Sequence, residues 1–237
     1  MGGRLTARSS PSVAMVSSVI YRARWTAHSS FCSNKTAPIS LVTAASFGKM
    51  PTTSLRRLRA VRDRALLAFG MAGAFRRSEL VALRVSDVEW VKEGLRVTIR
   101  RGKTDQEGAG ATVAIPEGRR LRPKALLEAW VQQAGIVDGP LFRQLVRGKK
   151  DAASVAPSPM SDRAVARLVQ ARAVAAGYLG SDFAGHSLRA GFLTAAARAG
   201  ASVFKMREVS RHKSMQVLAD YVRDAELFRD HAGEGFL

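Results

Sequence analysis

The chain has 237 residues, of which 46% are hydrophobic, so it is long enough to bury a sizeable core in one large domain or two small ones. Its 38 Lys and Arg residues outnumber 19 Asp and Glu residues, which gives a net charge of +19. This charge favours a polyanionic partner, by default nucleic acid, although the chain could also be a soluble basic protein without such a partner. The single cysteine, Cys32, excludes an intramolecular disulfide framework and a cysteine-built metal site, and no apolar run is long enough to cross a bilayer.

The N-terminal part differs in composition from the rest. Residues 1–60 contain no Asp or Glu, and residues 1–50 carry ten serines with weak helical or strand periodicity. Three interpretations stay open: a flexible basic arm, a transit-like segment, or the front of a truncated or frame-shifted reading frame. We favour the third because the composition changes so abruptly. We therefore expect residues 1–54 to be an atypical, disordered or truncated segment.

The next segments predict two helices and a small sheet. A helix over 62–75, "RDRALLAFGMAGAF", contains the longest apolar run and is interpreted as a core helix. A second short helix is predicted over 77–88. Alternating apolar residues and glycine-containing turns then predict an antiparallel sheet, with strands over 89–91, 95–101 and 111–116.

The C-terminal half is predicted to be helical. A helix over 121–135 ends at a glycine, and a helix over 161–177 begins after a serine N-cap. The segment between them, 143–159, is interpreted as a polar, proline-containing loop. Further helices are predicted over 186–200, 203–211 and 214–228. The predicted fold class is mainly α with one small antiparallel β-sheet.

Two basic residues stand where they could meet a phosphate. Arg76, in "GAFRRSELVAL", lies at the turn between two apolar helices, and its planar guanidinium suits phosphate oxygens. Glu79, three residues on, could hold that guanidinium in place. Lys103 lies in the hairpin turn 102–110, from which it could reach a phosphate or donate a proton. The alternatives are a surface arginine and a solvated turn lysine.

The late segments contain two histidines, an arginine and a tyrosine of interest. His186 and Arg189, in "GHSLRAG", are three residues apart and are expected to share a helix face. Because no acid stands at adjacent helical spacing, Arg189 is expected to face an anion, although a structural pair is the alternative. His212 precedes Tyr221 by nine residues in "SRHKSMQVLADYVR". A tyrosine in such a helix is otherwise a core or interface residue.

Together, the order Arg, Lys, His-x-x-Arg, His, Tyr resembles the catalytic domain of the tyrosine recombinases, the phage-integrase family. The resemblance runs from about Leu55 to Arg229. "RRSELVALRVSDV" is similar to the first arginine box, "GHSLRAGFLTAAARAG" to the second, and "VSRHKSMQVLADYVR" to the tyrosine box. The resemblance implies a tyrosine-recombinase catalytic-domain fold over residues 55–237. Arg211 stands where the family frequently has glycine, a departure that we expect to be minor.

The resemblance implies which residues bind the scissile phosphate. Arg76 and Arg189 would clamp it, and His212 would hydrogen-bond one of its oxygens. We choose Arg76 over Arg77 because it stands three residues before Glu79, which matches the family's Arg-x-x-Glu pattern. Two arginines suit this role because they neutralise charge that grows in the transition state without losing protons themselves.

The resemblance also implies the residues that transfer protons and attack. Tyr221 would be the nucleophile that forms a 3′-phosphotyrosyl enzyme, Lys103 would protonate the leaving 5′ oxygen, and His186 would assist proton transfer. An unperturbed tyrosine has a pKa of about 10, so only roughly one in a thousand is ionised at pH 7. A neighbouring base or the positive field of the clamp must offset that handicap of about 4 kcal/mol.

The predicted function is that of a site-specific recombinase or integrase of a mobile element, which cuts and rejoins DNA without metal, cofactor or ATP. Its expected partner is double-stranded DNA, on which the resemblance implies a homotetramer. Basic segments 56–67 and 143–150 are expected to grip the DNA backbone with a salt-sensitive affinity. We expect a cytoplasmic, nucleoid-associated bacterial protein. The alternatives are a truncated, non-catalytic DNA-binding remnant and a type IB topoisomerase-like enzyme, since the family's usual N-terminal helical domain is not recognisable in residues 1–54.

Overall fold

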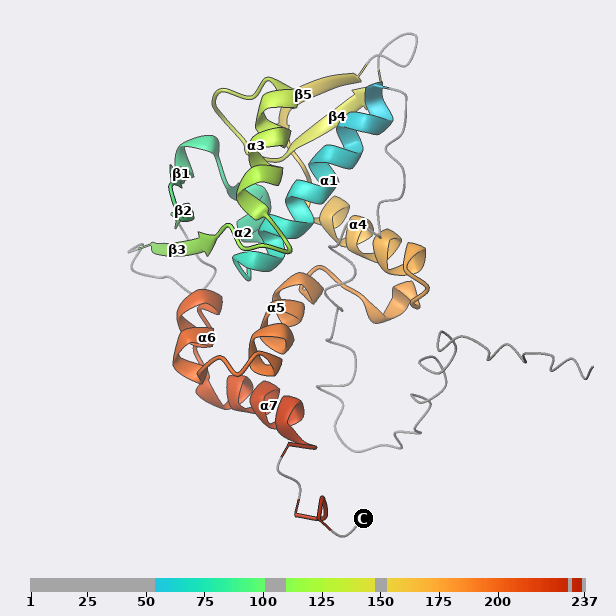
Figure 1. The fold of residues 1–237 in the computed structure, drawn as a ribbon. Coiled ribbons are helices and arrows are strands. Elements are labelled where there is room, and N and C mark those ends of the chain that lie inside the picture. The colour runs from blue at the N-terminus through green and yellow to red at the C-terminus, as the bar shows by residue number, and fades with distance from the viewer. Residues whose placement is uncertain (1–53, 101–109, 148–152, 230–231, 236–237) are drawn as a thin grey trace, which may run out of the picture. The chain divides into compact units, whose positions relative to one another are not determined.

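The computed structural model describes residues 54–100, 110–147, 153–229 and 232–235 (Figure 1), which belong to one compact unit. The atypical segment 1–53 and the hairpin turn that carries Lys103 lie outside the described residues. Within the described ranges, no helix has both the length and the apolar character that a bilayer crossing requires.

Helix α1, Ser54–Ala72, is the central element of the core. It begins eight residues before the predicted start, and Leu66 and Phe69 on it are fully buried. The helix ends at Ala72 because Ala74 has a φ of 47°, in the left-handed region. The chain then reverses, and the Phe75 ring stacks on Phe69 with ring centroids 5.0 Å apart. The predicted end at residue 75 is therefore wrong by three residues.

Two short helical segments lead into the predicted sheet. Helix α2 covers Arg77–Ala82, and a 3₁₀ turn covers Val85–Asp87. The predicted helix over 77–88 breaks at Leu83, which is extended and whose carbonyl accepts a hydrogen bond from the Leu141 amide at 2.9 Å. The three predicted strands are confirmed, in the antiparallel order β1-β2-β3, with bounds Val88–Val91, Gly94–Ile99 and Ala111–Pro116.

A second, two-stranded sheet occupies the predicted loop. Helix α3, Pro123–Ala134, ends at Gly135 with a φ of 60° and packs along α1. Strands β4, Arg143–Arg147, and β5, Ala153–Pro159, then pair antiparallel. The loop prediction was wrong because both strands lie at an edge, where prolines and exposed polar side chains are tolerated.

The remaining helices follow the predicted order. Helix α4, Asp162–Ala175, begins after Ser161, whose hydroxyl accepts a hydrogen bond from the Ala164 amide at 3.2 Å, as predicted. A 3₁₀ turn, Gly180–Asp182, follows it. The last three helices have the bounds Ser187–Arg198 for α5, Val203–Ser210 for α6 and Met215–Glu226 for α7.

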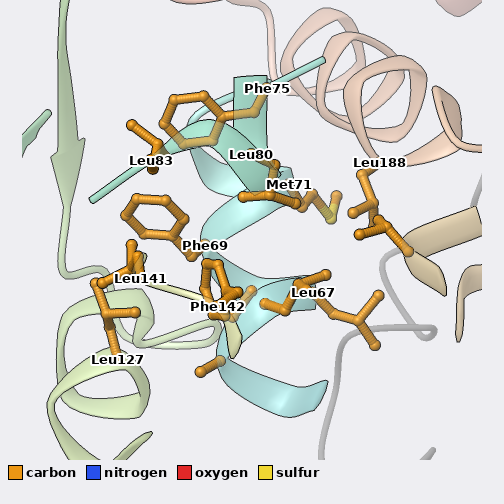
Figure 2. Close-up of a cluster of buried hydrophobic side chains, with 14 of the residues drawn as sticks. Leu67, Phe69, Met71, Phe75, Leu80, Leu83, Leu127, Leu141, Phe142 and Leu188 are labelled. Carbon is orange, nitrogen blue, oxygen red and sulfur yellow. The ribbon is translucent and has the colours of Figure 1, made fainter. Parts of the chain in front are cut away.

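Close packing of α5 against α1 brings the two arginine-containing segments together. Figure 2 shows Leu188 of α5 next to Met71 of α1, at the edge of the main hydrophobic cluster. A Cβ at Gly70 would lie only 3.0 Å from Leu188 Cδ1, so glycine permits this approach. A smaller cluster joins α5, α6 and α7, with the buried residues Leu193, Ala197, Met206 and Leu218.

Candidate active site

Arg76 is held by Glu79 at the turn between α1 and α2. Arg76 is the N-cap residue of α2, and its backbone amide donates to Glu79 Oε2 at 2.9 Å. Its Nη1 donates to Glu79 Oε1 at 2.5 Å. Glu79 is 5% exposed, whereas the Arg76 side chain is 26% exposed. A buried carboxylate thus orients a guanidinium that still reaches the surface, which is the arrangement that the Arg-x-x-Glu spacing indicated.

Arg77, the neighbouring arginine, points to a different part of the molecule. Its Nη2 lies 3.2 Å from Asp162 Oδ2 at the start of α4. A Cβ at Gly185 would lie 2.4 Å from Arg77 Cδ, so the glycine of "GHSLRAG" makes room for this side chain. The geometry therefore favours Arg76 over Arg77 as the arginine of the site.

Arg189 lies in the first turn of α5 and is 6% exposed. Its Nη1 donates to the carbonyl oxygen of Ala74 at 2.9 Å, across 115 positions of the sequence. Its Nη2 lies 3.2 Å from His212 Nδ1. Among the described residues, no carboxylate forms an ion pair with Arg189. A buried cation held by neutral groups is a candidate for binding an anion.

His212 is positioned by the turn between α6 and α7. Its Nδ1 lies 2.9 Å from the hydroxyl of the fully buried Ser210 and 3.2 Å from Arg189 Nη2. A guanidinium only donates, so Nδ1 accepts from Arg189, and the proton of a neutral ring then lies on Nε2. An Nε2–H group is a suitable donor to a phosphate oxygen.

The site has more positive than negative charge. Among the described residues, the charges of Arg76, Arg189 and Arg211 all interact with the carboxylate of Glu79. Burial, followed by repulsion from Arg76 and Arg211, lowers the pKa of Arg189 to about 9. Burial also acts to raise the pKa of Glu79, but the hydrogen bond from the Arg76 amide and the charge of Arg211 outweigh it and hold that pKa below 4.5. An anion bound here would relieve the repulsion.

Tyr221 lies on α7, close to this charged cluster. It is partly buried against the small hydrophobic cluster of α5, α6 and α7. Its electrostatic effect on Arg189 acts to raise the pKa of that arginine, so the phenol is within range of the guanidinium. The structure therefore brings Arg76, Arg189, His212 and Tyr221 into one region, although they come from four segments.

His186 lies at the start of α5, and Lys103 lies outside the described residues. His186 is exposed and is the N-cap residue of α5, with φ −98° and ψ 1°, so it precedes the helix. The hydroxyl of Ser187, the first residue of α5, accepts a hydrogen bond from the Ala184 amide at 2.9 Å. The expectation that His186 lies on the helix is wrong, since it is the N-cap residue that precedes α5, whereas Arg189 lies in the first turn.

Sequence reasoning missed the contribution of Arg211 and Ala74. Both adopt a left-handed conformation that favours glycine, with φ of 56° and 47°. The carbonyl of Ala74 binds Arg189, and the side chain of Arg211 binds Glu79. The signal in the sequence was the arginine at a frequent glycine position, which we had expected to be a minor departure. Over the described ranges, no group of three or more His, Cys, Asp or Glu side chains could hold a metal ion.

Comparisons with known proteins identify the family of this chain. Residues 47–227 match the model of the phage integrase family. An integrase/recombinase XerD homolog of Selenomonas ruminantium is 36% identical over 178 residues, which cover 74% of this chain and 51% of the relative. The chain therefore belongs to the phage integrase family, the tyrosine recombinases.

Solved structures show the same fold. The XerH site-specific recombinase bound to its difH substrate, in a pre-cleavage complex, is similar with a TM-score of 0.60 and 17% identity, over 81% of this chain and 52% of XerH. The XerA recombinase has a TM-score of 0.56 and 16% identity, over 85% of this chain and 62% of XerA. The predicted tyrosine-recombinase fold is thus confirmed. The sheet of β4 and β5 is the part of the described fold that the sequence analysis had interpreted as a loop. The chain spans about half the length of the relatives that it matches first.

Proposed function

We propose that residues 55–237 form the catalytic domain of a site-specific DNA recombinase, which cuts and rejoins double-stranded DNA without metal or ATP. One observation carries this proposal: the buried guanidinium of Arg189, which is held by the Ala74 carbonyl and His212 and repelled by Arg76 and Arg211, lies within electrostatic range of Tyr221. Such a cluster suits an anionic group that becomes more negative during reaction, as a phosphodiester does under attack. Membership of the tyrosine recombinases supports the same conclusion.

In the proposed reaction, the Tyr221 oxygen attacks the phosphorus of the DNA backbone. A bond forms between this oxygen and phosphorus, the bond to the 5′ oxygen breaks, and Lys103 supplies the proton to the leaving oxygen. His186 assists by accepting the proton that the Tyr221 hydroxyl loses, so that one proton is taken up and one is supplied in the step. Arg76, Arg189 and the Nε2–H of His212 bind the phosphate oxygens. The 3′-phosphotyrosine retains the bond energy, so attack by a 5′ hydroxyl reseals the strand without ATP.

The surface of the described residues supports a DNA partner in part. Exposed arginines project from α1 and α4, at positions Arg56, Arg57, Arg59, Arg163 and Arg167. Two residues of the predicted DNA-gripping segments point inward instead, because Arg62 pairs with Asp63 and the Arg143 guanidinium binds the Asp138 and Pro140 carbonyls. We propose that the outward arginines contact the phosphate backbone and that the chain acts as a tetramer on bacterial DNA in the nucleoid.

The test is covalent capture of DNA. A pool of nicked duplexes with a randomised core is incubated with the protein, and denaturant-resistant complexes are recovered and sequenced. We expect capture by the parent chain and none by Tyr221→Phe. The matched control is Tyr178→Phe, because Tyr178 is 43% exposed and contacts Phe183 at a ring-centroid distance of 5.8 Å. This control should capture DNA at the parent rate.

Other outcomes would identify the alternatives. DNA binding without capture by the parent would indicate a non-catalytic remnant and overturn the proposal. Relaxation of supercoiled DNA without exchange of strands between duplexes would indicate a topoisomerase-like enzyme. Equal capture by the parent and by Tyr221→Phe would show that another group is the nucleophile.

A further inference from the structure

Arg211 occupies the turn between α6 and α7, directly before His212, in a backbone conformation that favours glycine. Its φ is 56°, in the left-handed region, where a Cβ is unfavourable. Its side chain is only 14% exposed. Burying a guanidinium on an unfavourable backbone requires contacts that offset both costs, so the contacts of Arg211 indicate its role.

These contacts connect the His212 turn with the turn between α1 and α2. Arg211 Nη2 donates to Glu79 Oε2 at 2.8 Å, and its Nη1 donates to the Gly73 carbonyl at 3.3 Å. The guanidinium carbon lies 5.5 Å from the centre of the Phe75 ring. In return, the Arg211 carbonyl accepts a hydrogen bond from Arg76 Nη2 at 3.4 Å.

The two oxygens of the Glu79 carboxylate bind the side chains of different arginines. Oε1 binds the side chain of Arg76, and Oε2 binds the side chain of Arg211 together with the Arg76 amide. Arg211 Nη1 is further bonded to the Val209 carbonyl at 2.5 Å, so the guanidinium is directed inward. Arg211 thus supplies position and charge to the site, while Arg76 remains the more exposed of the two.

We propose that Arg211 is a positioning residue for DNA strand transfer: it fixes the turn that carries His212 against the turn that carries Arg76. This inference rests on the proposed function. Because Arg189 binds both the Ala74 carbonyl and His212, a shift between these turns would separate the groups that are to hold one phosphate. A displacement of about 1 Å in such a site can lower a reaction rate by roughly 10²-fold.

The charges that face Glu79 give the proposal a pH signature. These charges are Arg76 at the start of α2, Arg189 on α5 and Arg211. Arg211 is one of the groups that lower the pKa of Glu79, so its removal raises that pKa. Protonated Glu79 no longer pairs with Arg76 as a carboxylate. The acid limb of the pH–rate profile should therefore move to higher pH when Arg211 is replaced.

The experiment compares Arg211→Gly, Arg211→Lys and the control Arg207→Ala in the full chain. Arg207 is an exposed arginine of α6, the helix that precedes Arg211, so its removal changes the net charge equally. The measurements are the single-turnover rate of covalent capture at saturating nicked DNA, taken from the duplexes that the parent captures, and the Kd for the same DNA from fluorescence anisotropy.

We expect Arg211→Gly to lower the capture rate by roughly 10- to 100-fold while the Kd changes less than about twofold. Arg211→Lys should recover part of the rate, because an ammonium can pair with Glu79 but cannot bind the carbonyls at the same time. The acid limb should move for Arg211→Gly and not for Arg207→Ala. An unchanged capture rate for Arg211→Gly would overturn the proposal. A capture rate that falls by the same factor as the affinity for DNA would also overturn it.

A second measurement separates this inference from the proposed function. If the parent captures no DNA, the proposed function fails, and with it the effect on rate. The connection between the turns is then tested on the protein alone, with Arg211→Gly, Glu79→Gln and the double variant in denaturant unfolding. Each single variant changes the unfolding equilibrium constant by some factor, and independent residues would give the product of the two factors in the double variant. We expect the factor of the double variant to be roughly tenfold smaller than that product. A simple product would show that the two residues are not coupled and would overturn the inference.

Discussion

Among the described residues, two buried carboxylates, Asp63 and Glu79, each form ion pairs with two arginines, but their surroundings differ. Asp63 on α1 is 3% exposed and binds Arg62 Nη2 at 2.9 Å and Arg172 Nη2 at 3.6 Å. Glu79 on α2 is 5% exposed and binds Arg76 and Arg211. Only the second cluster has a further buried guanidinium, that of Arg189, whose described contacts include no ion pair with a carboxylate.

The difference distinguishes a structural ion pair from the proposed phosphate-binding site. Arg62 also donates to the Arg143 carbonyl at 3.2 Å, so the Asp63 cluster connects α1 with β4. At Glu79, the surplus positive charge lowers the pKa of Arg189, with burial as the larger cause. Surplus buried charge lowers stability, and proteins retain such strain chiefly where function needs it. We therefore propose that similar residue types serve two purposes in this protein, and that the charge balance of each cluster distinguishes them.

The largest expected effect comes from Arg189→Met, which removes the surplus charge. We expect the capture rate to fall by roughly 10³-fold, because a donor to the developing phosphate charge is lost. Thermal unfolding should show a Tm no lower than that of the parent, since a buried, repelled cation is replaced by an apolar side chain. A large fall in Tm would mean that Arg189 is a structural residue, as Arg62 is.

The converse is expected for Arg62→Met in the Asp63 cluster. This change leaves a buried carboxylate without its closest partner, and we expect it to lower the free energy of unfolding by about 3 kcal/mol. Urea denaturation measures this loss. The capture rate of the folded protein should stay within about twofold of the parent, as for other substitutions outside a site. A strong loss of rate would break the distinction between the clusters.

Glu79→Gln should affect both properties moderately. The ion pairs with Arg76 and Arg211 are lost, and we expect the free energy of unfolding to fall by about 2 kcal/mol at neutral pH. Because the pKa of Glu79 lies below 4.5 in the folded protein, the unfolded chain binds more protons as the pH falls. The stabilisation is therefore complete above about pH 4.5 and is lost below it. Unfolding curves of parent and variant should converge as the pH is lowered through this range.

The smallest expected effect is a gain from Ala74→Gly. Ala74 has a φ of 47°, which costs an L-residue roughly 1–2 kcal/mol, whereas glycine loses about 0.5–1 kcal/mol more in chain entropy. We expect a net rise of about 0.5 kcal/mol in the free energy of unfolding. The matched control is Ala197→Gly, at a buried position inside α5, which should lower it by about 1 kcal/mol. Equal effects at both positions would contradict the strain at Ala74.

Local patterns predicted the fold where they carried the decisive information. Alternating apolar residues and turn glycines identified the three-stranded sheet, and Ser161 identified the start of α4. The segment 143–159 was missed because β4 and β5 are defined by pairing with each other, which no single segment shows. His186 was placed on a helix because a spacing of three does not reveal where a cap begins the first turn.

By itself, the sequence determined the family, the helical fold and the spacing of Arg76 and Glu79, because these depend on local periodicity and on the order of residues along the chain. Only the tertiary structure decided that Arg77 turns toward Asp162, that Arg62 is bound internally and that Arg211 joins the site. These outcomes depend on which charges are buried together. Burial is a property of packed helices from distant parts of the chain, so it becomes defined only when α5 and the turn after α6 lie against the end of α1.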